Sequence, residues 1–103
     1  MINNVISQAG YVELVKASST SIANLGIFLC NTDTRNADVI DLFIVPSGET
    51  PGDEHKILSE LYIPPSQTFS FGEEKFILEP GDSIGFSAQV GGRITATVTF
   101  TEL

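Results

Sequence analysis

Apolar and polar residues alternate at every second position in segment after segment of the chain. A period of two is typical of β-strands with one buried face, whereas helices repeat every three to four residues. The clearest segments are residues 83–90 and 93–100, where apolar residues alternate with small or polar ones. Gly91-Gly92 lies between them, and glycine readily adopts the positive φ angles that a two-residue hairpin turn requires. The sequence therefore predicts that these two strands pair as a β-hairpin.

Six further segments are rich in β-branched and aromatic residues and are separated by polar turn clusters, proline and glycine. Two of them, residues 22–30 and 39–45, are apolar on both faces, which favours central strands or strands covered by a neighbouring subunit. About eight short strands without crossover helices predict an all-β fold, an antiparallel β-sandwich or jelly roll. The six segments are residues 11–17, 22–30, 39–45, 57–63, 68–71 and 75–78.

A chain of 103 residues has room for a single hydrophobic core. We therefore predict one β-sandwich domain over residues 11–103, preceded by an N-terminal segment, residues 1–10, that stands apart from it. Ile2, Val5 and Ile6 make this segment apolar. It is expected either to add an edge strand to a sheet or to reach across to another chain.

The chain carries 13 acidic and 5 basic residues, which gives a formal net charge of −8. Such a charge repels phosphate backbones, and the basic residues are scattered singly instead of forming a patch, so we expect no direct nucleic-acid partner. The apolar runs are much shorter than the roughly 20 residues of a membrane-spanning helix, so no membrane partner is expected. Cys30 lies in an apolar run and is expected to be a buried thiol of the core.

Two motifs were candidates for chemistry. Gly81-Asp82-Ser83-Ile84-Gly85 matches the spelling of a nucleophile elbow, but an elbow leads from a strand into a helix, whereas this segment leads into a strand. A small hydrolase acting through Ser83 is therefore the least favoured hypothesis. Asp53, Glu54 and His55 are consecutive potential metal ligands, but neighbouring residues seldom point at one ion. The sequence predicts no catalytic, cofactor-binding or metal-binding residue and no cofactor.

Two sets of residues are candidates for contact with a partner. The first combines the apolar N-terminal residues with the polar face of the strand at 93–100. Cross-strand threonines are also common on ordinary sheet surface, and this is the favoured interpretation of that face. The second lies in the long polar loop over residues 46–56, because exposed loops often carry binding residues. The first set is Ile2, Val5, Ile6, Thr95, Thr97 and Thr99, and the second is Glu49, Asp53, Glu54 and His55.

Five short motifs follow one another along the chain, mostly at turns and core positions. They are Leu29-Cys30-Asn31-Thr32, Val45-Pro46-Ser47-Gly48, Lys56-Ile57-Leu58, Pro65-Ser66-Gln67-Thr68-Phe69 and Leu78-Glu79-Pro80-Gly81-Asp82-Ser83. In this order they resemble a group of small virion proteins of tailed bacteriophages. Residues 1–10 and the acidic loop at 48–56 fit that pattern poorly.

The resemblance implies a structural role in a phage particle and carries over no catalytic residue. It favours a non-enzymatic capsid decoration or cement protein, or an accessory protein of the neck or tail, made in the host cytoplasm and located in the virion. The expected partners are other virion proteins, such as the major capsid protein or a neck or tail protein, and further copies of the chain in a homo-oligomer, for example a trimer. The alternative is a receptor- or carbohydrate-binding module of a tail, neck or fibre that uses the loop at 46–56.

Overall fold

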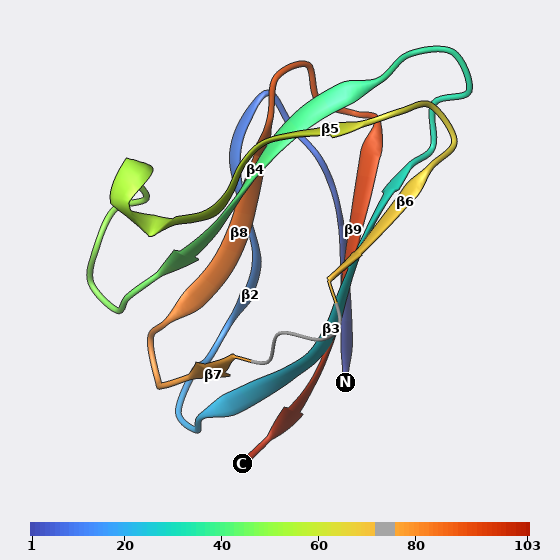
Figure 1. Cartoon of the computed structure of the whole chain (residues 1–103). Helices are drawn as coiled ribbons and strands as arrows, with labels where there is room; N and C mark the ends of the chain where they lie inside the picture. The colour runs from blue at the N-terminus through green and yellow to red at the C-terminus, as the bar shows by residue number, and fades with distance from the viewer. Residues whose placement is uncertain (72–75) are drawn as a thin grey trace.

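The computed structural model of the chain describes residues 1–71 and 76–103, which form strands and one short 3-10 helix (Figure 1). The predicted all-β sandwich is confirmed, with nine strands among the described residues. Lys75, at the start of the predicted strand 75–78, lies outside the described residues. The elements are β1 (Ile2–Ile6), β2 (Gly10–Lys16), β3 (Ile22–Asn31), β4 (Asp38–Val45), η1 (Asp53–His55), β5 (Lys56–Ile63), β6 (Thr68–Phe71), β7 (Ile77–Leu78), β8 (Ser83–Ala88) and β9 (Ile94–Glu102).

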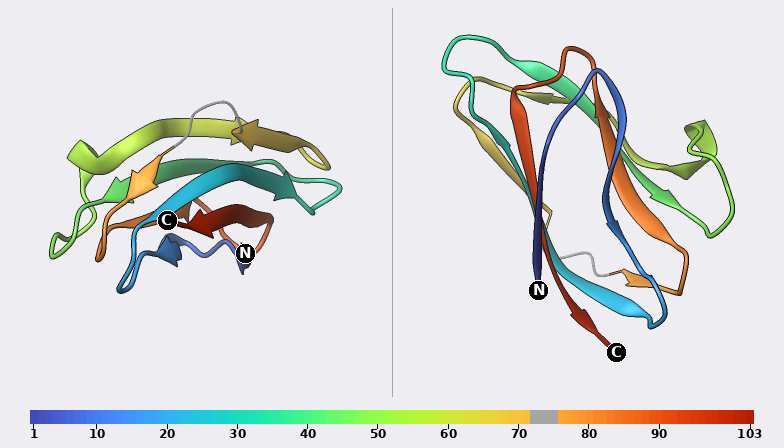
Figure 2. Two further views of the ribbon diagram at one scale, coloured as in Figure 1. Left: turned by 90° about the horizontal axis from the view of Figure 1, so that it is seen from below. Right: turned by 180° about the vertical axis from the view of Figure 1, so that it is seen from behind.

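The strands form two antiparallel sheets with a jelly-roll order. Sheet A runs β1-β9-β3-β6, with β7 also paired to β3, and sheet B runs β2-β8-β4-β5. Strands from the first half of the chain therefore pair with strands from the second half: β1 with β9, β2 with β8, β3 with β6 and β4 with β5. Seen from below, β5 and β6 lie at one edge of the sandwich and β1 and β2 at the other (Figure 2).

The strands predicted to form a hairpin, β8 and β9, do not pair with each other. β8 lies between β2 and β4 in sheet B, whereas β9 lies between β1 and β3 in sheet A. Apolar and polar residues alternate in both strands because each strand has one face toward the shared core, β8 from sheet B and β9 from sheet A. The hairpin prediction is therefore wrong. Gly91 and Gly92 do have positive φ angles, 90° and 75°, but the connection crosses between sheets.

This crossing is held by hydrogen-bond acceptors from distant parts of the chain, one a side chain and one a backbone carbonyl. The buried carboxylate of Asp38 accepts hydrogen bonds from two backbone N–H groups of the crossing, at 3.2 and 3.0 Å. The carbonyl of Ser7 accepts another from the N–H of Gly92 at 2.7 Å. A Cβ on Gly91 would overlap the backbone of residues 8–9, so glycine is required there for space as well as for φ. The backbone groups that a hairpin would have paired are satisfied in this way.

The core lies between the inner faces of the two sheets. Over residues 1–71 and 76–103 it contains sixteen buried apolar side chains, contributed mainly by the central strands β3 and β9 of sheet A and β4 and β8 of sheet B. Cys30 is not among them. It is half-buried and lies on the outer face of β3, so the prediction of a core thiol is wrong. In a strand the face is set by parity, and Ile27 and Leu29 take the inner positions.

Candidate functional site

The outer face of sheet A carries most of the large apolar side chains that remain exposed. Nine such side chains are exposed in the described residues, and five of them lie on strands of sheet A, with exposed fractions between 43% and 66%. Scattered single apolar residues are normal on a protein surface, but a concentration on one sheet face indicates a contact surface. The five are Ile2, Ile6, Leu25, Phe28 and Ile77.

The pairing register places the predicted threonines on this same face. Residues directly opposite each other in an antiparallel pair share a face. Ile2 lies opposite Thr99 and Ile6 opposite Thr95. Between these pairs, the Asn4 side-chain amide donates a hydrogen bond of 2.8 Å to the Thr97 hydroxyl. The apolar N-terminal residues and the threonine row therefore form one continuous strip over β1 and β9.

The strip continues across β3 to β6. Thr97 lies opposite Phe28, and Phe28 lies opposite Ser70 on β6. Thr95 lies opposite Cys30 in the same way. Phe28 therefore projects from the middle of the sheet, with uncharged side chains on both sides. Sequence reasoning missed Phe28, although the apolar character of both faces at residues 22–30 had indicated a covered strand.

Val5, unlike Ile2 and Ile6, points into the molecule. It is half-buried and packs against the core. Parity explains the difference, because Val5 is one position out of step with Ile2, Asn4 and Ile6 along β1. We therefore define the outer face of sheet A without Val5, as Ile2, Asn4, Ile6, Leu25, Phe28, Cys30, Ser70, Ile77, Thr95, Thr97 and Thr99.

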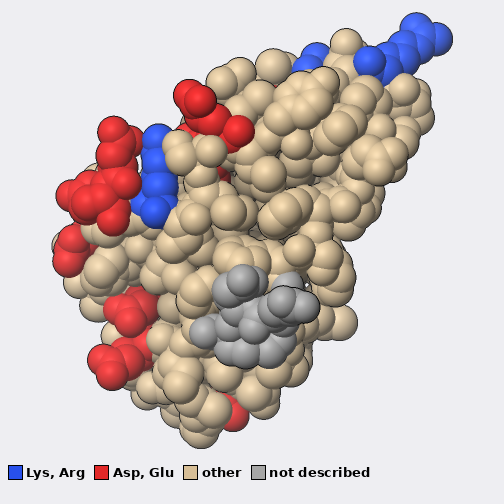
Figure 3. All heavy atoms as spheres, in the orientation of Figure 1, with Lys and Arg blue, Asp and Glu red and all other residues tan. Residues whose placement is uncertain are grey.

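In the part of the chain that the structure describes, the outer face of sheet A is also the uncharged side of an acidic molecule. The strands of sheet A contain a single ionisable acidic or basic residue, Glu102, at the end of β9. Sheet B carries acidic and basic side chains on β2, β4 and β5. In the view of Figure 3, acidic side chains of the described residues lie mainly along the left side, from η1 and β5 down to the neighbourhood of β7, with a further acidic spot at the lower end, and none shows on the right beside β6.

The polar loop at 46–56 is tied down by its own histidine. His55 is only 8% exposed, and its Nδ1 accepts a hydrogen bond of 3.1 Å from the N–H of Gly52. An accepting Nδ1 leaves the proton on Nε2, which lies 2.9 Å from Glu49 Oε1 and donates to it. Both ring nitrogens are therefore engaged within the loop, so His55 and Glu49 shape the loop instead of presenting free groups to a partner.

The other two loop candidates lie at its surface. Asp53 Oδ1 pairs with Lys56 Nζ at 3.1 Å, and this contact is the main cause that raises the pKa of Lys56. Glu54 is exposed. The four predicted residues of this loop therefore do not converge on one site, because two hold the loop together and one pairs with a neighbouring lysine.

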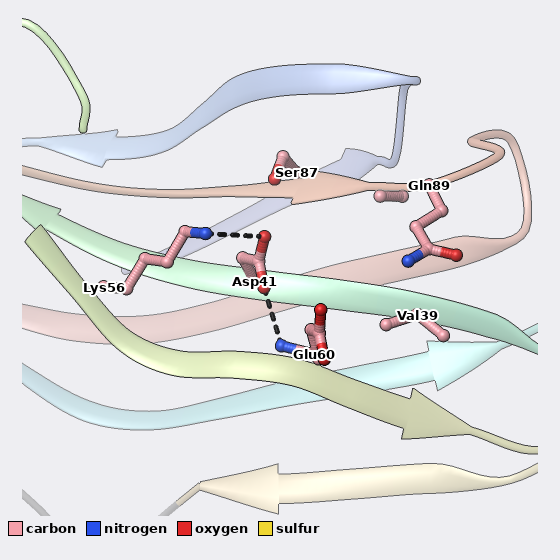
Figure 4. A pocket seen from close by; sticks show the side chains of 7 residues that line it. Val39, Asp41, Lys56, Glu60, Ser87 and Gln89 are labelled. Carbon is pink, nitrogen blue, oxygen red and sulfur yellow. Dashed lines mark hydrogen bonds and ion pairs between the residues drawn. The ribbon is translucent and has the colours of Figure 1, made fainter. Parts of the chain in front are cut away.

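A small polar cleft lies beside this loop, on the outer face of sheet B (Figure 4). Its volume is about 130 Å³. Lys56 Nζ reaches Asp41 Oδ2 at 3.4 Å, and Asp41 Oδ1 accepts a hydrogen bond of 2.7 Å from the N–H of Glu60. This bond holds Glu60 at a left-handed φ of 55° in the irregular pairing of β4 and β5. The charges of the cleft are thus largely compensated from within. It is lined by Val39, Asp41, Lys56, Glu60, Ser87, Ala88 and Gln89.

The structure gives Ser83 no nucleophile geometry. Ser83 is the first residue of β8, so no helix follows it as an elbow requires, and it is 7% exposed. The ring nitrogens of His55 are bonded to Gly52 and Glu49 and not to Ser83. Tyr11 is half-buried with its hydroxyl inside the protein, and this burial is the main cause that raises its pKa. Ser83 is therefore a buried strand residue beneath the loop.

Neither metal-ligand clusters nor membrane-spanning helices occur in the described part of the chain. Over residues 1–71 and 76–103, no group of three or more His, Cys, Asp or Glu side chains could hold a metal ion. Within the same ranges, no helix has the length and apolar character needed to cross a membrane.

Comparison with known proteins adds no family to this description. No protein-family model matches the chain, and no curated protein matches it. Its function is therefore argued from its own surface and from the pattern of its sequence motifs.

Proposed function

We propose that the chain is a non-enzymatic structural protein of a bacteriophage particle, a decoration, cement or accessory subunit that works through protein contacts. The observation that carries the proposal is the outer face of sheet A, an apolar and uncharged surface on a molecule with a net charge of −8. The order of motifs shared with small virion proteins of tailed bacteriophages supports the particle as the place where this face is used.

The energetics of the face favour a contact role over a solvated one. Apolar surface removed from water contributes roughly 25 cal/mol per Å². Ile2 and Phe28 alone leave 64% and 43% of their surface in water. A partner that covers them gains this free energy, and because the described residues of the face carry no charged side chain, none of them has to be desolvated at a cost.

The acidity favours a place on the outside of a particle. A subunit with a charge of −8 is repelled by packaged nucleic acid, whereas on an outer surface the same charge keeps particles apart in solution. We therefore propose a place on the outer surface of the particle, beside capsid, neck or tail proteins, with the acidic side of sheet B turned to solvent.

The experiment compares purified particles that carry wild-type protein with particles made with Phe28→Glu. We expect the variant to be depleted from particles, because an unpaired carboxylate would be buried in the contact. Val90→Glu is the matched control, since Val90 is 54% exposed and lies outside sheet A. Quantitative mass spectrometry of the particles gives the copy number, which is high for a shell protein and low for a receptor-binding tip module. Absence of the wild-type chain from purified particles would overturn the proposal.

A further inference from the structure

We infer that the partner seated on the outer face of sheet A is a second copy of this chain, packed face to face. The inference deepens the proposed function and rests on the same surface, but it names the occupant. Three observations carry it: where the charges lie, how large the face is, and how its side chains are arranged.

Charge restricts how two copies can meet. Each copy brings a net charge of −8, so contacts through most of its surface bring like charges together. The strands of sheet A carry only Glu102, at the margin of the sheet. Of the two sheets, sheet A is the one through which identical acidic subunits can approach without facing carboxylates at close range. A basic partner would instead be expected to favour the acidic side of sheet B.

The face is large enough for a modest homotypic interface. The strands of sheet A have five, ten, four, two and nine residues, which at about 3.4 Å rise per residue and about 4.8 Å between strands cover a flat area of about 490 Å². Side chains roughen that plane and enlarge its accessible surface, so the face suits a contact at the small end of the range, below the roughly 800 Å² per partner of a standard interface. A contact of about 800 Å² would cover about one seventh of the 5425 Å² of accessible surface of the chain.

The side chains suit packing of one sheet on another. Two stacked sheets need side chains that interdigitate at a separation of about 10 Å. Phe28 projects from the centre of the face between the short side chains of Thr97 and Ser70. In a two-fold arrangement the same patch is used by both copies, so each Phe28 can enter the threonine and serine rows of the other. A closed two-fold contact would bury Ile2 and Ile6 at its rim.

The test is sedimentation equilibrium of the full chain over a concentration series. We expect wild-type protein to associate and Phe28→Glu to weaken association by a factor of about ten or more, since a desolvated, unpaired carboxylate costs more than 1.4 kcal/mol. Val90→Glu should associate as wild type does. Ile6 lies on the same face and is 48% exposed in the single chain. Ile6→Glu therefore serves as a second variant in case Phe28→Glu fails to fold. Circular dichroism of each variant establishes that it is folded.

Mixing complementary variants separates a self-contact from a contact with another protein. Phe28→Glu and Phe28→Lys should each associate weakly alone, and their mixture should form heterodimers, because position 28 lies at the centre of the face, so that opposite charges there come close to each other across a two-fold contact. A wild-type chain that stays monomeric while particles still incorporate it overturns this inference and leaves the proposed function standing. A chain that dimerises through Phe28 but is absent from particles would support this inference and overturn the proposed function. Association of Phe28→Glu equal to that of wild type also overturns the inference.

Discussion

Gly85 is a residue at which one methyl group would disturb the packing of sheet B. A Cβ at this position would overlap the phenol ring of Tyr11, which crosses β8 and packs edge-on against Phe43 with 5.4 Å between ring centroids. Because Phe43 lies opposite Gly85 on β4 and is itself buried, the ring of Tyr11 has little room to move.

We expect Gly85→Ala to lower the free energy of unfolding by about 1–3 kcal/mol, the usual cost of overpacking. Gly26→Ala is the control, because its added Cβ would meet its nearest atoms at 3.7 Å, an ordinary contact distance. Urea denaturation of both variants checks the prediction. Equal stability of the two variants would show that Tyr11 can move away without cost.

Asp33 makes the stability of the turn before β4 depend on pH. Its Oδ1 accepts hydrogen bonds from the N–H groups of Arg35 at 2.7 Å and Asn36 at 2.9 Å. These bonds, the one from Arg35 first, favour the ionised carboxylate and lower the pKa of Asp33 below its ordinary value of 3.8. A lowered folded-state pKa means that the stabilisation is present at neutral pH and is lost as the pH falls through the folded-state value.

We therefore expect Asp33→Asn to be less stable than wild type at pH 7, and the difference to shrink as the pH is lowered below about 3.8. Denaturation curves at a series of pH values measure it. Glu54→Gln removes the same charge from an exposed position without removing a turn acceptor, so its effect should be small throughout. A difference between Asp33→Asn and wild type that grows toward acid pH would contradict this role for Asp33.

At the scale of elements, β1 shows how one strand can serve two purposes. Its inner residue Val5 packs against the core, whereas its outer residues Ile2 and Ile6 face away from the molecule. Deleting residues 1–6 would remove both contributions together, so single-face substitutions separate them better.

We expect Val5→Ala to lower the free energy of unfolding by about 1 kcal/mol with little effect on association, because it removes two methyl groups from a half-buried side chain that packs against the core. The double variant Ile2→Ser with Ile6→Ser should weaken association with little effect on the unfolding of the single chain. Thermal unfolding and sedimentation of the same samples measure the two effects. The account of β1 fails if the double variant unfolds more easily than Val5→Ala but associates normally.

Most strands of the fold could be predicted from the sequence because alternation is a local signal. The partner of each strand is not a local property, and this is why β8 and β9 were wrongly paired: Gly91 and Gly92 have the expected conformation, but Asp38 and Ser7, distant in sequence, decide where the connection runs. Parity along β3 likewise decides that Cys30 faces outward, which its apolar neighbours could not reveal.

At the scale of the whole molecule, the uneven distribution of charge is the property that organises its surfaces. One sheet carries almost no charge and the other side carries most of the acidic residues visible in Figure 3. Five of the six predicted interface residues lie on the uncharged face, because the alternation of residues along a strand, which the sequence shows, decides which side chains share a face. The central Phe28 was not predicted, because only the register across β9, β3 and β6 shows that it stands among them.

Charge also predicts how association responds to salt. Two copies with a net charge of −8 repel each other, and salt screens that repulsion, whereas the apolar contact itself contains no ion pair to be weakened. We expect self-association to strengthen as sodium chloride is raised from low to physiological concentration. Sedimentation at a series of salt concentrations measures it. Association that weakens with salt would indicate ion pairs across the contact and a different face.

The most direct measurement of the central claim uses the chain's single cysteine, which lies on the outer face of sheet A beside Phe28. The rate at which a small maleimide modifies Cys30 is followed while the protein concentration is raised through the range in which the sedimenting mass increases. Our account predicts that the rate falls in step with association, and that it does not fall for Phe28→Glu. A Cys30 that reacts equally fast in the monomer and in the assembled protein would show that assembly leaves this face open.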